Sequence, residues 1–340
     1  MQADPPRYYR ALILGAGTSA EAGVPVTKNF RATARRVAGS ADGKVRDRML
    51  AVIDHWDRSF SFYNIEELYS YVELCEGAGI SLPGDPSIST DDIRFLILAT
   101  LGNALARVDD RMRNRYSGFW SRTASDSLVL SFNWDNLLDI GVTGATGLGE
   151  TLDYGPIPII PCGFGSDGSS PTTGHRTLVK PHGSTNWLHC KRCGNVHVYP
   201  SHLIPLQVSI GGSKVNCTVC GDGSPLQPLI VPPSPQKVTG DPSRQPFAAL
   251  WRLVAETLTQ VHEVHLIGYS MPEMDLQFKL LFRETLSRNT DLEKVMVHTT
   301  SKVGYAWTDF QEHFVEILSP VGKAGLLSFR EEPFGRYAGP

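Results

Sequence analysis

Short apolar runs and longer helical segments alternate along this chain. Six mainly apolar runs are typical of buried strands, at residues 9–14, 128–130, 177–180, 229–231, 261–267 and 295–297. Spacing, capping residues and composition predict helices at 29–37, 64–75, 91–105, 247–261 and 275–282. This alternation predicts an α/β fold in which a Rossmann-like parallel sheet has helices on both faces.

The predicted helices gather in one part of the chain. Residues 29–125 contain no convincing strand pattern, so we expect a helical insert there. Asn64 is a candidate N-cap, with Glu67 three residues later as its capping-box partner. Either Asp91 or Asp92 is expected to cap the next helix.

Polar motifs follow several of the predicted strands. They are found at 14–25, 131–135, 180–183 and 268–270. Open α/β sheets bind ligands at the carboxyl ends of their strands. We therefore expect these motifs to form one ligand site.

The first motif resembles a dinucleotide-binding turn. Gly15, Gly17 and Ala20 match G-x-G-x-x-G/A directly after a strand, where glycines let the backbone approach a pyrophosphate. The following residues 23–25, Gly-Val-Pro, end the helix after about one turn, and no acidic residue closes a second strand about 20 positions later. The pattern indicates a nucleotide site outside the dehydrogenase lineage.

Composition limits the function classes. The 340 residues carry a net charge of −3, which gives no basic footprint for nucleic acid. No run of about 18 apolar residues predicts a membrane span. The first ten residues lack the apolar core of a signal peptide, so a cytoplasmic protein is expected.

Four of the six cysteines form two C-x-x-C pairs. Cys190 pairs with Cys193, and Cys217 pairs with Cys220, a spacing that predicts a structural four-thiolate zinc site. Disulfides are the alternative, but nothing indicates an oxidising compartment. Residues 187–228 are predicted to form an inserted zinc module, and residues 1–186 and 229–340 form the Rossmann-like domain.

The order of these motifs resembles the sirtuin-like, or silent-information-regulator-type, family. The motifs are GAGTSAEAGVP, SFNWD, KPHGSTNW, two C-x-x-C pairs, PLIVPP and LIGYSMPEMD, and they span the chain. The resemblance implies a Rossmann-type NAD domain with a zinc-bearing small domain. It also implies cleavage of NAD between nicotinamide and ribose.

The resemblance implies roles for single residues. Asn133 is expected to bind ribose or the attacking water, Asp135 the nicotinamide carboxamide, and His182 is expected to act as a general base. The remaining expected contacts hold the pyrophosphate and the adenosine half of NAD, and they are Gly15, Ala16, Gly17, Ser19, Gly268, Tyr269 and Ser270.

Each role has a structural alternative. Asn133 could cap the helix that follows it, Asp135 could be an ordinary first-turn acid, and Tyr269 could be a core aromatic. His182 could be a turn residue before glycine. For Asp275 the N-cap of a helix is the favoured interpretation rather than a site role.

Departures from protein-deacylating sirtuins bear on the reaction. Phe132 replaces the family's glutamine, and residues 26–28, Val-Thr-Lys, replace Asp-Phe-Arg. The prolines in 232–235 remove N–H groups that would pair with a peptide strand. The block 60–110 resembles bacterial sirtuin-like proteins of the defence type, which hydrolyse NAD. The four cysteines favour a deacylase instead.

The leading hypothesis is an NAD hydrolase that produces nicotinamide and ADP-ribose in bacterial anti-phage defence. An NAD-dependent protein-lysine deacylase is the first alternative, and a non-catalytic nucleotide-sensing subunit is the second. A homo-oligomer, or a defence partner such as an ATPase encoded nearby, would fit the resemblance. Direct binding of nucleic acid or a membrane is not expected.

Overall fold

The computed structural model describes most of the chain. The described residues are 8–59, 64–81, 88–146, 152–162, 176–211, 213–221, 223–232, 245–299 and 307–337. Within these ranges no helix combines the length and the apolar character that a membrane crossing requires.

A seven-stranded parallel sheet forms the centre of the molecule. Its strands follow the order β11-β10-β9-β1-β2-β5-β3, and every pair is parallel. They are β1 (Arg10–Leu14), β2 (Ser127–Ser131), β3 (Leu152–Asp153), β5 (Arg176–Val179), β9 (Glu263–Ile267), β10 (Lys294–Thr299) and β11 (Leu327–Glu331). The predicted α/β fold with a parallel sheet is confirmed.

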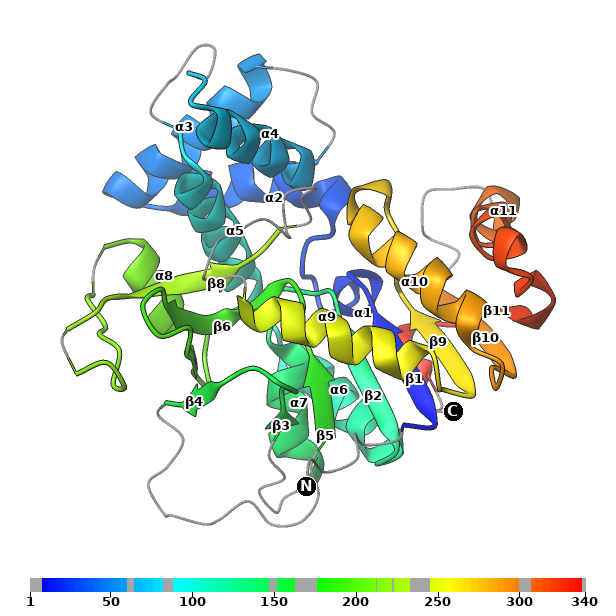
Figure 1. Ribbon diagram of the computed structural model, residues 1–340. Coiled ribbons are helices and arrows are strands. Elements are labelled where there is room, and N and C mark those ends of the chain that lie inside the picture. The colour runs from blue at the N-terminus through cyan, green and yellow to red at the C-terminus, as the bar shows by residue number, and fades with distance from the viewer. Residues whose placement is uncertain are drawn as a thin grey trace.

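Helices lie on both faces of this sheet (Figure 1). The helices α9 (Gln245–Leu258) and α10 (Leu276–Arg288) lie in front of it in that view, and α6 (Asp110–Arg122) and α7 (Leu137–Thr146) lie behind. All of β2 and all of β1 except the half-buried Arg10 are buried, because both faces of the parallel sheet are covered, and this explains their apolar sequences.

The helical segment forms a group of its own (Figure 1). It contains α2 (Thr27–Ser40), α3 (Gly43–Ser59), α4 (Ile65–Ala78) and α5 (Thr90–Leu105), with α5 in contact with the other three. Asn64 caps α4 as predicted, because its side chain accepts the N–H of Glu67. The predicted cap of α5 is wrong. Ser89 is the N-cap, and Asp92 is its capping-box partner.

A second, smaller sheet lies beside the first. Its order is β4-β7-β6-β8, with the strands β4 (Ile159–Pro161), β6 (Gly183–Cys190), β7 (Val196–Val198) and β8 (Leu226–Ile230). The short helix α8 (Leu203–Ser209) packs against it. The sequence pattern predicts the apolar run at 229–231 as a strand of the main parallel sheet. This prediction is wrong, because β8 pairs antiparallel with β6 in the small sheet. The small sheet also begins before and ends after the predicted module 187–228.

Candidate functional site

The candidate residues gather at one edge of the main sheet. The strands β9, β1, β2 and β5 are neighbours in that order, and their carboxyl ends carry the four polar motifs. The continuing backbone stays close beyond the strands, since Phe132 N–H donates to the Leu14 carbonyl at 2.9 Å and Gly268 N–H donates to that of His298 at 2.8 Å. The candidate residues are therefore brought together from four segments spread between residues 14 and 270.

Close approach of two turns explains the glycines after β1. A Cβ on Gly15 would lie 2.6 Å from the Cα of Tyr269, and one on Gly17 would lie 2.8 Å from the Gly268 carbonyl oxygen. The N–H of Gly15 donates to Ile267 and that of Gly17 to Gly268, at 3.1 and 2.9 Å. These two amides are thus used within the protein, and the glycines are required by contact with the turn at 268–269.

The short helix α1 (Gly17–Ala20) connects this loop to Asn133. The Asn133 Nδ2 donates to the hydroxyls of Thr18 at 2.9 Å and Ser19 at 3.0 Å. Asn133 is 7% exposed, and its Oδ1 has no hydrogen-bond partner among the residues that the structure describes. Its side chain thus reaches α1 rather than capping α7. A buried carbonyl oxygen without a partner is costly and marks a place for a donor from a ligand or water.

Asp135 serves as the local cap instead. Its Oδ1 accepts the N–H of Leu137 at 3.1 Å, at the start of α7. Burial raises the pKa of this carboxyl, and the Lys180 ammonium and the Ser19 hydroxyl oppose part of the shift. The carboxyl is almost fully covered, so any ligand contact it makes needs a specific donor in the site.

Sequence reasoning gave no role to Lys180, which the structure buries completely. Its Nζ donates to the Asp135 carbonyl at 2.6 Å, to Ser184 Oγ at 2.6 Å and to Asp139 Oδ2 at 3.2 Å. Its charge is therefore paired and hydrogen-bonded, as a buried ammonium requires. This network joins the end of β5 to the loop after β2 and fixes their relative position.

His182 lies beside a buried carboxylate that was not expected at the site. Its Nε2 is 3.4 Å from Asp275 Oδ1, and Asp275 Oδ2 accepts the Tyr269 hydroxyl at 2.7 Å. All three side chains are nearly inaccessible. Burial and the Asp275 charge raise the pKa of Tyr269 well above its ordinary value, which keeps the phenol a donor. The three groups form a chain from Tyr269 through Asp275 to His182.

Asp275 occupies the N-cap position of α10 as predicted, but its side chain does not act as a cap and makes no capping hydrogen bond. Its carboxylate turns inward from a 3₁₀ turn, Glu273–Asp275, that follows Met271, whose φ of 51° is unusual for a residue with a side chain. The turn after β9 is therefore shaped to deliver a carboxylate to His182.

Aromatic packing completes this arrangement. The Phe132 ring stacks on Tyr269 at 4.7 Å and meets the edge of His182 at 5.0 Å. Tyr269 is thus both a core aromatic and a hydrogen-bond donor. The remaining candidates lie nearer the surface, since Ala16 and Gly17 are exposed and Ser270 is half-buried.

The four predicted zinc ligands form one cluster. The sulfur atoms of Cys190, Cys193, Cys217 and Cys220 all lie within 4.8 Å of one another. Two pairs, Cys190–Cys220 and Cys193–Cys217, are 3.7 Å apart, too far for a disulfide. Sulfurs held about 2.3 Å from a tetrahedral zinc are separated by about 3.8 Å, so the donor set fits a structural zinc ion.

The zinc cluster is connected directly to His182. Strand β6 begins at Gly183, the next residue, and ends at Cys190. The Val231 N–H donates to the His182 carbonyl at 2.9 Å, where the chain leaves β8. A change in the small sheet would therefore shift the histidine.

We expect purified protein to contain about one zinc ion per chain. Removing it with a chelator should loosen the small sheet and lower activity indirectly, because β6 leads to His182. Metal analysis and thermal unfolding measure both effects. Cys75→Ser is the matched control, since this cysteine lies in the main core outside the cluster. A Cys190→Ser variant that retains full zinc would contradict the assignment.

Comparisons with known proteins give limited guidance. No family model and no curated protein sequence matches the chain. Two similar solved structures are Sir2 in complex with the inhibitor EX-527, 2'-O-acetyl-ADP-ribose and deacetylated p53 peptide (13% identity, TM-score 0.36), and Sir2Tm bound to a propionylated peptide (12% identity, TM-score 0.37). Each alignment covers 97% of this chain and 90% of the other. TM-scores this low do not decide a family, so function must be argued from the site.

Proposed function

We propose that this protein is a sirtuin-like enzyme that cleaves NAD between nicotinamide and ribose. The observation that carries the proposal is the pairing of His182 with buried Asp275 at the carboxyl edge of a parallel sheet, the same edge at which Asn133 follows β2. Buried titratable pairs with a specific partner are typical of catalytic sites. A nucleotide-sensing subunit would need no such pair.

The residues can be given chemical roles. Loss of neutral nicotinamide leaves positive charge on the ribose, so oxygen atoms nearby stabilise the transition state. The unpartnered Asn133 Oδ1 is suited to accept a ribose hydroxyl or the attacking water. The Asp275 carboxylate orients His182 and stabilises its protonated form, which suits a general base. Asp135 would accept the nicotinamide carboxamide.

Water is proposed as the acceptor of ADP-ribose. Pro232, two residues after the end of β8, lacks the N–H that an added peptide strand would use. The other prolines of that segment lie outside the described residues. Phe132 is packed between Tyr269 and His182, so it presents no polar group in place of the family's glutamine. The cysteine cluster favours the protein-lysine deacylase, which remains the second candidate.

Incubation of the protein with NAD alone is expected to release nicotinamide and ADP-ribose in equal amounts. Chromatography of the products measures this directly. The control is the same incubation with an acetyl-lysine peptide. Nicotinamide release that requires the peptide and yields O-acetyl-ADP-ribose would replace the hydrolase with the deacylase.

The biological setting belongs to the same proposal. An NAD hydrolase is harmful to its own cell, so a role in bacterial anti-phage defence would require control by a trigger. Assembly into a homo-oligomer or contact with a partner such as an ATPase encoded nearby would supply it. Comparing the activity of the chain alone with that of the chain plus such a partner tests this setting.

A further inference from the structure

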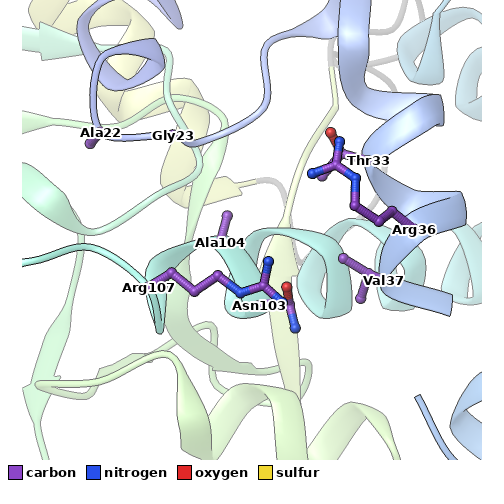
Figure 2. Close-up of a pocket in the computed structure, with 8 residues that line it drawn as sticks. All are labelled: Ala22, Gly23, Thr33, Arg36, Val37, Asn103, Ala104 and Arg107. Atoms are coloured by element: carbon purple, nitrogen blue, oxygen red, sulfur yellow. The ribbon is translucent and has the colours of Figure 1, made fainter. Parts of the chain in front are cut away.

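A cavity of about 210 Å³ lies apart from the strand-end site. It is partly open to solvent and is lined by the turn after α1 at Ala22 and Gly23, by α2, and by the last turn of α5 with Arg107 just beyond it (Figure 2). None of its lining residues is among those assigned to NAD. Its chemistry therefore needs a separate explanation.

The polar groups of the cavity are all suited to donate hydrogen bonds. Figure 2 shows the Arg36 guanidinium beside Thr33 on α2 and the Arg107 guanidinium beside Asn103 on α5. No acidic residue lines the cavity. The site therefore presents two positive charges and two neutral polar side chains to any occupant.

Both arginines lack partners, in contrast to their neighbours. Arg31 and Arg35 on the same helix α2 both form ion pairs with Asp57. Within the described part of the chain, no hydrogen bond or ion pair of the Arg36 or Arg107 side chain is found. Of these three arginines on α2, only Arg36 has no carboxylate partner in the described part of the chain.

Arg36 and Arg107 are both exposed side chains that line the same pocket, and two cations on one pocket favour the binding of an anion. A guanidinium group offers a planar fork of N–H donors that matches phosphate oxygens in pairs. Thr33 and Asn103 can add neutral hydrogen bonds. The cavity is smaller than the roughly 300 Å³ at which sites for larger ligands begin, so it fits a phosphate group with at most a small attached moiety.

We propose that this cavity is a binding site for a phosphate-bearing small ligand, distinct from the NAD site. The ligand is held by Arg36 and Arg107, with Thr33 and Asn103 as secondary contacts. Because Ala22 and Gly23 continue the chain from Ser19, which bonds Asn133, an occupant would contact the segment that supports the catalytic asparagine.

Calorimetric titration at constant ionic strength tests the proposal, with inorganic phosphate and ribose 5-phosphate as probes. Arg36→Gln and Arg107→Gln are each expected to weaken binding about tenfold or more, because each removes a charge-assisted contact. Tighter binding of ribose 5-phosphate would identify a sugar phosphate as the ligand, and equal binding would identify free phosphate. NAD cleavage is not the readout, so failure of the proposed function would leave this result interpretable.

Arg111→Gln is the matched control. Arg111 is exposed on α6, outside the cavity, and the substitution removes the same charge. It should leave phosphate affinity unchanged. The proposal is overturned if the wild-type protein binds neither probe up to about 10 mM, a very weak affinity. It is equally overturned if the Arg111 variant loses as much affinity as the cavity variants, or if neither cavity variant loses any.

Discussion

Asn133→Ala is expected to lower the rate of NAD cleavage by about 10²–10³-fold, the loss typical for removing one oriented polar group from a transition state. The Oδ1 of this side chain is buried and has no hydrogen-bond partner among the described residues, so it can accept a hydrogen bond from the substrate. The fold should persist, because the Thr18 hydroxyl keeps its hydrogen bond to the Gly15 carbonyl. Steady-state release of nicotinamide and thermal unfolding measure the two properties.

Asn289→Ala is the matched control, which distinguishes a loss of catalysis from a loss of stability. This asparagine is equally buried, but its Nδ2 donates to the Leu258 and Val261 carbonyls, which joins α9 and α10 away from the site. Its replacement should lower the unfolding temperature and leave kcat near the wild-type value. An Asn133 variant that hydrolyses NAD at the wild-type rate would refute the role given to this residue.

The parallel sheet and the gathering of the candidate residues at one edge of it could be predicted because both depend on local signals. Apolar runs such as 10–14 and 263–267 mark buried strands, and the polar residues that follow them must meet at one edge. The cysteine cluster could be predicted for a similar reason. The spacing within each C-x-x-C pair already fits one metal ion.

The sequence alone could not show which sheet the strand at 229–231 joins or which residue caps α5. The run at 229–231 is short and apolar, which fits either sheet, and only antiparallel pairing with β6 decides it. Ser89 and Asp92 both have capping side chains. Helix α5 begins after Ser89 because the Ser89 hydroxyl accepts the Asp92 N–H and the Asp92 carboxylate accepts the Ser89 N–H.

The role of Asp275 depends on contacts between distant residues. Its position before a helix is typical of an N-cap, and nothing within its own segment indicates otherwise. The carboxylate meets His182 only because β9 and β5 belong to one sheet and the turn after β9 bends inward. Lys180 was missed for the same reason, since its partners lie on the loop after β2 and on α7.

Asp275→Asn is expected to lower kcat by about 10–10³-fold with a smaller change in KM, because the substitution keeps the side-chain size but removes the charge that stabilises protonated His182. The Tyr269 hydroxyl can still donate to the amide oxygen, so the turn should keep its shape. A protonated histidine without its carboxylate is less stable. The fall in activity on the acid side should therefore occur at lower pH than in the wild-type enzyme.

Glu332→Gln provides the matched control for this change. Glu332 also accompanies a buried histidine, with its Oε1 2.7 Å from His298 Nδ1, but neither residue belongs to the candidate site. Removing this carboxylate should lower the stability of the fold, but the pH dependence of NAD cleavage should stay the same as in the wild-type protein. If the profile of Asp275→Asn matches that of the wild-type enzyme while kcat falls, Asp275 acts only through the fold. If only Asp275→Asn moves the acid limb, the carboxylate acts through His182.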